Sequence, residues 1–385
     1  MSKVLILGGR APAALDHARR FAHQGWRVYV ADSVSCSMSA WSGAVAGSVR
    51  LPPPRFAPAA YVAELSRAIT ALGIDLVVPT CEEVFYLARY RQALPAACRI
   101  AVDDFDKLRS LHSKWEFQKL ARDCGGNAPA SALVENLDQA RAWAAGEPLV
   151  LKPEFSRFGV HVRVYRHGVP ANAPELALAG KWVAQRVCQG QEICSYSVAE
   201  RGRLLAHAAY LPKYRLHGSS SYYFEPYASE AIAAFVARFV ERHAFTGQIG
   251  FDWFDSGNGQ PAVIECNPRA VSGLHLFGLA DPLPAILAGA ASEPVCRGGE
   301  RARMLGPLMW TAGFADAIAR NDLRGWRADL RAADDVLAGQ GDTAPLAGAT
   351  VDLAAYAAAA LRQRCSLRQA ATRDIEWDGE ALEDV

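Results

Sequence analysis

The chain reads GQIGFDWF at residues 247–254 and IECNPR at residues 264–269, with Asn258-Gly259 between the two runs. Both runs alternate in the manner of β-strands, and Asn-Gly is the strongest short-range signal for a hairpin. With Asn258-Gly259 as a two-residue tip, Asp252 lies directly opposite Glu265. Side chains alternate along a strand, so Asn267 shares the face of Glu265. The sequence therefore predicts that two carboxylates and an amide meet on one face of a hairpin.

Directly paired side chains in a hairpin have Cβ atoms about 5 Å apart. Two carboxylates at that separation repel each other unless a cation joins them, and carboxylate and amide oxygens suit Mg²⁺. The alternative is an ordinary half-exposed hairpin with its polar residues outward. That alternative explains poorly why Trp253, Ile264 and Cys266 fall on the opposite face. A longer turn that shifts the register by one residue would separate the two acids.

The composition sets the limits for the rest of the chain. It has 385 residues, of which 51% are hydrophobic and 21% charged, and its formal net charge is +1. A large core is therefore available, disorder throughout is excluded, and no global charge favours nucleic acid or an anionic membrane. The nine cysteines form no CxxC pair, and we find no signal peptide and no uncharged apolar stretch of about 20 residues. We expect a soluble cytoplasmic protein.

Strands and helices alternate in the first hundred residues. Short apolar runs at 4–7, 26–31 and 74–79 are typical of buried strands, and helical patterns cover 13–24 and 61–72. Such alternation predicts a parallel sheet covered by helices.

The turn after the first strand, Gly8-Gly9, and Asp32 at the end of the second strand suggest a dinucleotide site. The sequence from residue 8 is GGRAPA, which lacks the GxGxxG spacing that admits a pyrophosphate. A tight strand-to-helix turn is therefore the favoured interpretation.

The pattern changes from about residue 111. Ser113 and Glu116 have the spacing of a capping box, which opens a helix that Gly125-Gly126 ends. Strand-like runs follow at 148–153, 182–185 and 192–199. The Ala-rich tail after about residue 290 is expected to be mainly helical, and we find no chemical motif in it.

The E-x-N-P-R end of the hairpin, preceded by Gly250-Phe251-Asp252, resembles the metal-binding end of ATP-grasp ligases. This superfamily includes the biotin carboxylase, carbamoyl-phosphate synthetase and D-alanine–D-alanine ligase groups, and the resemblance covers roughly residues 1–290. It implies an α/β protein with four parts. These are an N-terminal parallel α/β domain (1–110), a small ATP-grasp subdomain (111–190), a large subdomain with the metal site (191–290) and a C-terminal extension (291–385).

The resemblance also implies roles for the hairpin residues. Asp252, Glu265 and Asn267 would hold Mg²⁺, or Mn²⁺ in its place, against the nucleotide phosphates. The first of these positions is often Glu in the family. Arg269 would contact the acyl-phosphate or the oxyanion formed when it is attacked, because arginine is always charged and offers a planar fork of donors.

Lys114 and Lys152 fall where the family places its ATP-phosphate lysines. Lys152 lies in an apolar strand run, an unusual place for a charge without a partner. Its alternative interpretation is a solubilising lysine on an edge strand. Lys114 alone would mean little, since a lysine on a capped helix is normally solvated.

The segment 154–160 stands where the family has a glycine-rich phosphate loop, but it holds one glycine where there are often several. The resemblance implies that Ser156, Arg157 and the backbone at Gly159 contact phosphate, with Arg157 replacing the missing backbone contacts.

The run from Gln185 resembles the hinge that binds adenine and ribose. Backbone groups at Arg186 and Cys188 would read the adenine edge, and Glu192 would bind the ribose hydroxyls. The first hinge residue, commonly Glu in the family, is Gln185 in this chain. Without the resemblance, Glu192 is simply the polar start of a strand.

Two further groups are weaker candidates. Lys213, Arg215 and His217 share one face if their run is extended, and they would contact phosphate or a substrate carboxylate; a solvated loop is the equal alternative. Glu82 and Glu83 follow a parallel strand at its carboxyl end, where α/β folds place ligands, and they are candidates for an amine site.

The resemblance implies an ATP-dependent carboxylate–amine ligase that releases ADP. Its partners would be a small carboxylate and an amine, and we expect it to bind neither nucleic acid nor a membrane. A homodimer is left open as its assembly. Two alternatives remain: an enzyme of the carbamoyl-phosphate or carboxylase type that uses bicarbonate, and an ATP-binding sensor without catalysis. The sequence names neither the carboxylate nor the nucleophile.

Overall fold

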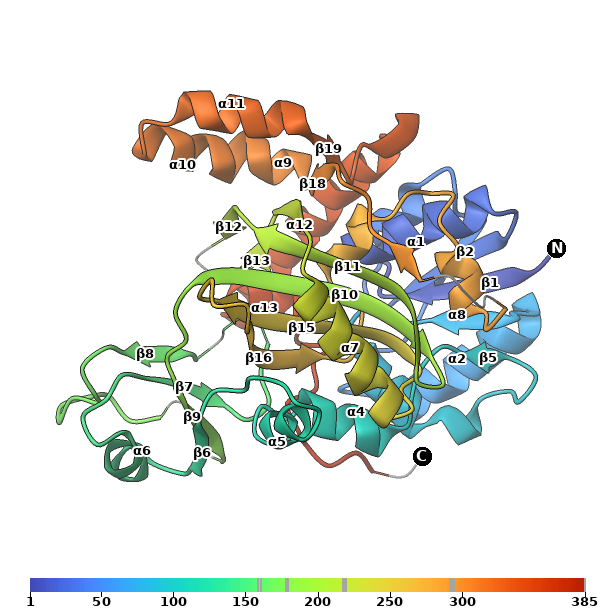
Figure 1. The fold of residues 1–385 in the computed structure, drawn as a ribbon. Helices are drawn as coiled ribbons and strands as arrows, with labels where there is room; N and C mark the ends of the chain where they lie inside the picture. The colour runs from blue at the N-terminus through green and yellow to red at the C-terminus, as the bar shows by residue number, and fades with distance from the viewer. Residues whose placement is uncertain (158, 160, 177–179, 217–219, 291–294, 384–385) are drawn as a thin grey trace.

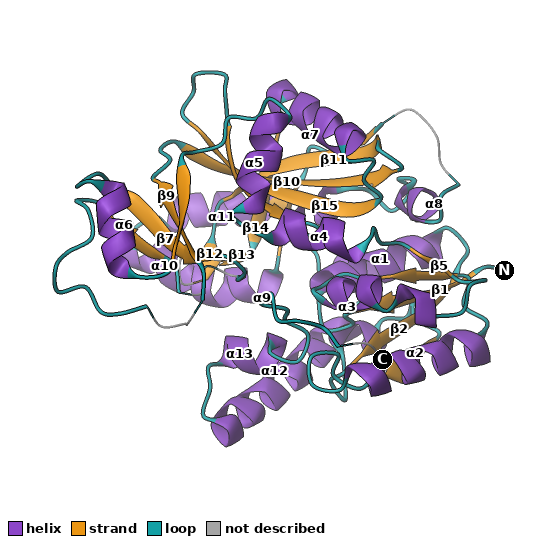
Figure 2. Ribbon diagram, turned by 90° about the horizontal axis from the view of Figure 1, so that it is seen from below, coloured by secondary structure: helices purple, strands orange, loops and turns teal. Residues whose placement is uncertain are grey.

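The computed structural model describes all residues except 158, 160, 177–179, 217–219, 291–294 and 384–385. The described residues form an N-terminal five-stranded sheet, a large eight-stranded sheet, a small four-stranded sheet and a separate pair of strands (Figure 1). Figure 2 shows the N-terminal sheet and the small sheet on opposite sides of the large sheet's long strands, with the C-terminus beside the N-terminal domain.

The N-terminal domain is a doubly wound parallel sheet, as the alternation predicts. Its five strands run in the order β3-β2-β1-β4-β5, and every pairing is parallel. The strands are β1 (Lys3–Leu7), β2 (Arg27–Asp32), β3 (Gly47–Arg50), β4 (Leu76–Val78) and β5 (Arg99–Ile100), and the helices are α1 (Pro12–His23), α2 (Pro58–Leu72) and α3 (Glu83–Arg89).

The turn after β1 is closed from within the protein. Gly8 has φ +73°, a left-handed conformation that glycine adopts without strain. Asp32 accepts the backbone N–H of Arg10 at 2.7 Å and its Nε at 2.9 Å. Asp32 therefore binds a protein guanidinium, which agrees with the interpretation as a tight turn.

The small sheet is antiparallel and four-stranded, in the order β6-β9-β7-β8. Its strands are β6 (Ser131–Val134), β7 (Leu149–Pro153), β8 (Arg163–Tyr165) and β9 (Trp182–Arg186), and helix α6 (Leu137–Ala144) covers it. Trp182 and Leu151 are fully buried in its core.

The large sheet runs in the order β16-β15-β10-β11-β14-β18-β19, and β17 pairs with β11. Its strands are β10 (Gln191–Glu200), β11 (Arg203–Pro212), β14 (Tyr223–Tyr227), β15 (Gly247–Asp255), β16 (Ala262–Asn267), β17 (Cys296–Arg297), β18 (Ala302–Met304) and β19 (Ala333–Asp335). Helix α7 (Glu230–Arg242) packs Phe235 and Phe239 against Phe251 and Trp253 of β15. A separate pair joins β12 (Arg215–Leu216) to β13 (Ser220–Ser221).

The β15–β16 hairpin keeps the predicted pairing of Asp252 with Glu265 by a different route. The two-residue tip is wrong, because the last paired residues are Phe254 and Ala262 and the loop between them is longer. A register shift between Asp252 and Trp253 compensates for that longer loop. Bulges of this kind insert one extra residue into one strand. The two acids therefore remain opposite each other.

The predicted capping box is only half formed. Helix α4 (Phe105–His112) ends just before Ser113, and α5 (Glu116–Asp123) begins after it. Ser113 Oγ accepts the N–H of Glu116 at 3.0 Å, as in a capping box. The Glu116 carboxylate turns instead to Arg109 Nη1, at 2.9 Å, because that guanidinium offers an opposite charge.

The C-terminal part is more than the helical extension we expected, since β17, β18 and β19 join the large sheet. Its helices are α8 (Leu283–Leu287), α9 (Gly306–Leu308), α10 (Phe314–Ala319), α11 (Leu323–Ala332), α12 (Ala344–Gln363) and α13 (Leu367–Thr372). Shorter helical turns occur at Met38–Trp41, Arg91–Ala93, Ser272–Leu276, Met309–Gly313 and Gly339–Gly341.

Helix α12 qualifies the expectation that no segment is apolar enough to span a membrane. It has 20 residues with mean hydropathy 1.4, and among the described residues it is the one helix that meets the length and composition of a span. It carries Asp352, which accepts the N–H of Met38 at 2.8 Å and is buried. That bond ties α12 to the N-terminal domain.

Candidate active site

Lys114 lies in the turn between α4 and α5 and is 2% exposed. Its Nζ donates to the carbonyl of Ser156 at 2.7 Å and lies 3.6 Å from Glu265 Oε1. The backbone N–H of Lys114 also donates to Glu154 O at 3.1 Å. This lysine is therefore buried and joins the loop after β7 to the β15–β16 hairpin, unlike a solvated lysine on a helix.

Lys152 lies in β7, and the structure rejects the edge-strand interpretation. Strand β7 is flanked by β9 and β8, and Lys152 pairs with Val183 of β9. Its side chain is buried, with Nζ 3.5 Å from the carbonyl of Ile264. Burial lowers the pKa of Lys152 to about 8, while the Glu265 carboxylate acts in the opposite sense. A buried cation beside the hairpin acids fits an anionic ligand.

Asp252, Glu265 and Asn267 come together as the sequence predicts. Asn267 Nδ2 lies 3.3 Å from Asp252 Oδ2. Burial, and then repulsion by Glu265, raise the pKa of Asp252 to about 6. The described residues hold no cluster of three or more His, Cys, Asp or Glu side chains in metal-binding geometry. Asp252, Glu265 and Asn267 nevertheless carry the carboxylate and amide oxygens that Mg²⁺ prefers, although the Asn267 amide oxygen accepts from Arg269 Nη2 at 3.2 Å in this structure.

Arg269 connects this set to the N-terminal domain. Its Nη2 donates to Asn267 Oδ1 at 3.2 Å, and its Nε lies 3.8 Å from Glu82 Oε1. The same Glu82 oxygen lies 3.3 Å from Arg157 Nε. Glu82 is 1% exposed, so its carboxylate is buried between two guanidinium groups. An anionic centre thus stands between two cations at the carboxyl end of β4.

Glu82 and Glu83 have different environments, although the sequence treats them alike. Glu83 Oε1 accepts the N–H groups of Thr80 at 2.9 Å and Cys81 at 3.0 Å, which closes the turn after β4. Burial raises the pKa of Glu83. Glu83 therefore supports the turn, and Glu82 is the acid that faces Arg157 and Arg269.

The loop after β7 is held close to Lys114. Glu154 Oε1 accepts the Ser113 hydroxyl at 2.6 Å. Ser156 is buried, and among the described residues its Oγ has no hydrogen-bond partner. Gly159 has φ +63°, which suits a sharp turn. An orphaned hydroxyl beside a buried lysine is a donor ready for a phosphate oxygen.

The hinge residues run from the end of β9 in the small sheet to the start of β10 in the large sheet. Gln185 is buried, and its Nε2 donates to Ser131 Oγ at 3.2 Å. The backbone N–H of Arg186 already donates to Ala130 O at 2.9 Å, so it is engaged within the sheet. Cys188 follows the end of β9, beyond that ladder. Glu192 Oε1 lies 2.6 Å from Arg215 Nη2.

The weaker basic candidates are separated by the structure. Lys213 Nζ lies 2.6 Å from Asp329 Oδ1 of α11 and 3.6 Å from Glu225 Oε2, whereas Arg215 turns to Glu192. His217 lies outside the described residues. Lys213 is thus engaged by the carboxylates of Asp329 and Glu225, and its predicted contact with phosphate remains a prediction.

Sequence reasoning missed the last twenty residues altogether. Trp377 is 1% exposed, and its backbone N–H lies 3.2 Å from Glu82 Oε2. The one available signal was Ile375 and Trp377 alternating with acidic residues, a period-two pattern in a tail otherwise rich in charge.

No family model and no curated protein matches the chain. Solved structures do match it. The L-amino acid ligase from Bacillus licheniformis has 16% sequence identity and a TM-score of 0.58, over 75% of this chain and 74% of that one. The ADP complex of N5-carboxyaminoimidazole synthetase from Staphylococcus aureus has 14% identity and a TM-score of 0.60, over 82% and 86%.

A third match is the biotin carboxylase ATP-analogue complex from Campylobacter jejuni, with 13% identity and a TM-score of 0.60 over 76% of this chain and 72% of that one. At these identities the likeness shows the fold. In this chain it comprises the parallel N-terminal sheet, the small antiparallel sheet and the large sheet, which is mainly antiparallel. The chain has the fold of the ATP-grasp ligases, as the resemblance of its hairpin implies.

Proposed function

We propose that the chain is an ATP-dependent ligase that activates a carboxylate as an acyl-phosphate and joins it to an amine, releasing ADP and phosphate. The observation that carries the proposal is the convergence of four buried or half-buried cations on three carboxylates. The cations are Lys114, Lys152, Arg157 and Arg269, and the carboxylates are Glu82, Asp252 and Glu265. Such a set fits a triphosphate and a metal together better than either alone.

The nucleotide phosphates would lie against Lys114, Lys152 and the hydroxyl of Ser156, with Arg157 beside them. The orphaned Ser156 Oγ supports this placement because a buried hydroxyl gains a partner there. Gln185, Cys188 and Glu192 would contact the adenosine. For Glu192 this requires sharing or releasing Arg215, which is its present partner.

Asp252, Glu265 and Asn267 would hold Mg²⁺, or Mn²⁺ in its place, and their oxygen donors fit such an ion. The bound ion would neutralise charge on the phosphoryl oxygens during transfer. Burial, and then repulsion by Glu265, raise the pKa of Asp252, and a divalent cation between the two acids would offset that repulsion. The chain's own contribution is to keep the acids paired across the hairpin.

In the first step a substrate carboxylate oxygen attacks the γ-phosphorus, and the bond from that phosphorus to the ADP oxygen breaks. In the second step the amine attacks the acyl carbon, a C–N bond forms, phosphate leaves and the nitrogen loses a proton. Arg269 would stabilise the oxyanion of that second step. Glu82 would orient the incoming amine from the carboxyl edge of the N-terminal sheet. For this its buried carboxylate has to share or release Arg157 or Arg269, which are its present partners.

We further propose that the enzyme acts in the cytoplasm on small molecules, with a homodimer as its candidate assembly. All nine cysteines are free thiols, which suits a reducing compartment.

The test is Mg²⁺-dependent ADP release from ATP with pooled carboxylic acids, each with and without pooled amines. Release that requires one acid and one amine supports the ligase. Release with bicarbonate alone replaces it with the carbamoyl-phosphate or carboxylase type. Tight ATP binding without release from any pool refutes catalysis and favours a sensor. Lys152→Met serves as the control, because it removes a buried charge from the site while keeping the length of the side chain.

A further inference from the structure

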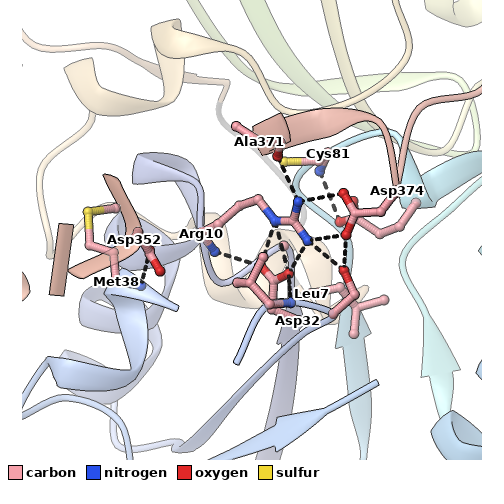
Figure 3. A network of polar contacts seen from close by, with 12 residues as sticks. Leu7, Arg10, Asp32, Met38, Cys81, Asp352, Ala371 and Asp374 are labelled. Atoms are coloured by element: carbon pink, nitrogen blue, oxygen red, sulfur yellow. Dashed lines mark hydrogen bonds and ion pairs between the residues drawn. The ribbon is translucent and has the colours of Figure 1, made fainter. Parts of the chain in front are cut away.

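The residues after α13 return across the N-terminal domain and are fixed there by Arg10. Its Nη1 and Nη2 lie 2.7 Å and 2.8 Å from the two oxygens of Asp374, and Nη1 also donates to Ala371 O at 2.7 Å. Figure 3 shows the guanidinium between Asp32, from β2, and Asp374. The side chain of Arg10 is 6% exposed. This partly buried ion pair anchors the start of the segment.

Arg55 provides a second anchor further along. Its guanidinium lies 2.8 Å from Asp378 Oδ2, 3.2 Å from Glu380 Oε1 and 3.8 Å from Glu376 Oε2. Tyr86 of α3 donates its hydroxyl to the carbonyl of Glu376 at 2.8 Å. The segment Asp374–Glu380, which we name the C-terminal strap, is therefore fastened on both sides of Trp377.

Trp377 contacts the candidate site through both its backbone and its ring. Its backbone N–H donates to Glu82 Oε2 at 3.2 Å. Its ring centroid lies 4.9 Å from that of Phe85 in α3, the helix that begins just after Glu82, and 5.2 Å from that of Phe155. A Cβ at Gly379 would overlap the Phe155 ring, so the strap packs tightly on that ring.

The contact with Phe155 links the strap to the proposed phosphate loop. Phe155 directly precedes Ser156, whose carbonyl accepts from Lys114 Nζ at 2.7 Å. The strap therefore supports the proposed phosphate loop through Phe155 and the proposed amine site through Glu82. With one Glu82 oxygen held by Trp377, the other oxygen is directed to Arg157 and Arg269.

We infer that the C-terminal strap is part of the active site and that Trp377 is a positioning residue, which holds Glu82 and the loop 154–157 in register with each other. The inference rests on the proposed function, in which Glu82 binds the amine and the loop binds phosphate. It assigns a role to the end of the chain, which carries no motif.

The experiment compares three full-length variants. Trp377→Ala removes the ring, and Trp377→Phe keeps an aromatic ring against Phe155. Trp326→Ala is the matched control: Trp326 is 4% exposed in α11 and packs 5.2 Å from Trp310. Two measurements are made on each: hydrogen exchange at 79–83 and 154–157, and the KM values and kcat of Mg²⁺-dependent ADP release.

We expect Trp377→Ala to raise exchange at both segments at least tenfold and to raise the KM for the amine at least tenfold. Trp377→Phe should recover most of both effects. Trp326→Ala should lower the melting temperature by a similar amount without either change. Unchanged exchange at 79–83 and 154–157 in Trp377→Ala overturns the inference, and so does faster exchange with wild-type kinetics.

The two readouts separate this inference from the proposed function. If the wild-type chain releases no ADP from any pool, the proposed function is refuted, and so is the catalytic role of the strap. Exchange at the two segments then still decides whether Trp377 holds them together. Equal losses of kcat and stability in Trp377→Ala and Trp326→Ala would reduce Trp377 to an ordinary core residue.

Discussion

Replacing Glu265 with glutamine tests the centre of the candidate site. Glu265 faces Asp252 across the hairpin, and its Oε1 lies 3.6 Å from Lys114 Nζ. The substitution keeps the size and shape of the side chain and removes one negative charge. It therefore removes a negative charge that partly neutralises the buried Lys114, and it also removes the repulsion between residue 265 and the half-buried Asp252.

These two effects on folding oppose each other. A unit charge pair at about 4 Å contributes about 4 kcal/mol at the effective dielectric of partly buried sites. The loss of attraction to Lys114 is offset by the loss of repulsion from Asp252, so we expect the free energy of unfolding to change by less than about 2 kcal/mol. The transition state has no such offset, because the proposed metal ion would lose an anionic ligand. A loss of about 3–4 kcal/mol there lowers kcat by about 10²–10³-fold.

The assay is Mg²⁺-dependent ADP release together with thermal unfolding monitored by circular dichroism. Glu200→Gln is the control, since Glu200 lies on the same sheet and pairs with Arg99 at 2.6 Å. Near wild-type ADP release from a folded Glu265→Gln would refute the metal assignment. If turnover is lost and a higher Mg²⁺ concentration restores it, Glu265 affects only the affinity for the metal.

Three further outcomes are expected. Burial lowers the pKa of Lys152 to about 8, so the lysine loses its proton as the pH rises through that value. The affinity for Mg-ADP, measured by calorimetry from pH 6.5 to 9.5, should therefore fall above pH 8. Lys152→Met should remove this pH dependence. Burial raises the pKa of Asp352 to about 6, so its charge destabilises the fold above that pH and has no effect below the pKa of the unfolded chain. Asparagine at this position can still accept the N–H of Met38. In thermal melts, Asp352→Asn should therefore stabilise the chain by on the order of 1 kcal/mol at pH 7.5 and by nothing near pH 4. Gly190 has φ +117° and no room for a Cβ beside Asp255, so Gly190→Ala should lower the melting temperature by several degrees, and an unchanged melt would contradict the strain.

The sequence predicts β1, β2 and β4 of the N-terminal sheet because these strands are short apolar runs with clear turns between them. It does not predict β3 and β5, which are short and contain no apolar run. It also predicts the pairing of Asp252 with Glu265, although through a tip that does not form. Local patterns carry this information, since alternation and turn chemistry act over a few residues. The acids meet because a bulge, which no local pattern announces, restores the register.

Long-range placement is the part that the sequence does not reveal. Trp377 lies 295 residues after Glu82, and only the complete fold brings its N–H to that carboxylate. Lys213 is similar, because its partner Asp329 is 116 residues away and no spacing rule connects them. The different roles of Glu82 and Glu83 also follow from the fold, because the turn after β4 uses one of them for its own N–H groups.

The bulge beside Asp252 separates the end of the hairpin from its chemistry. Residues 256–260 at the tip are exposed, and Asn258 closes the loop by accepting the N–H of Gln260 at 2.9 Å. Along both strands, the bulge lies between the tip and the paired acids, so an insertion or deletion at the tip is separated from those acids. The tip is therefore a place to insert an epitope or a fluorescent label, which would report on the hairpin from outside while its working end stays intact.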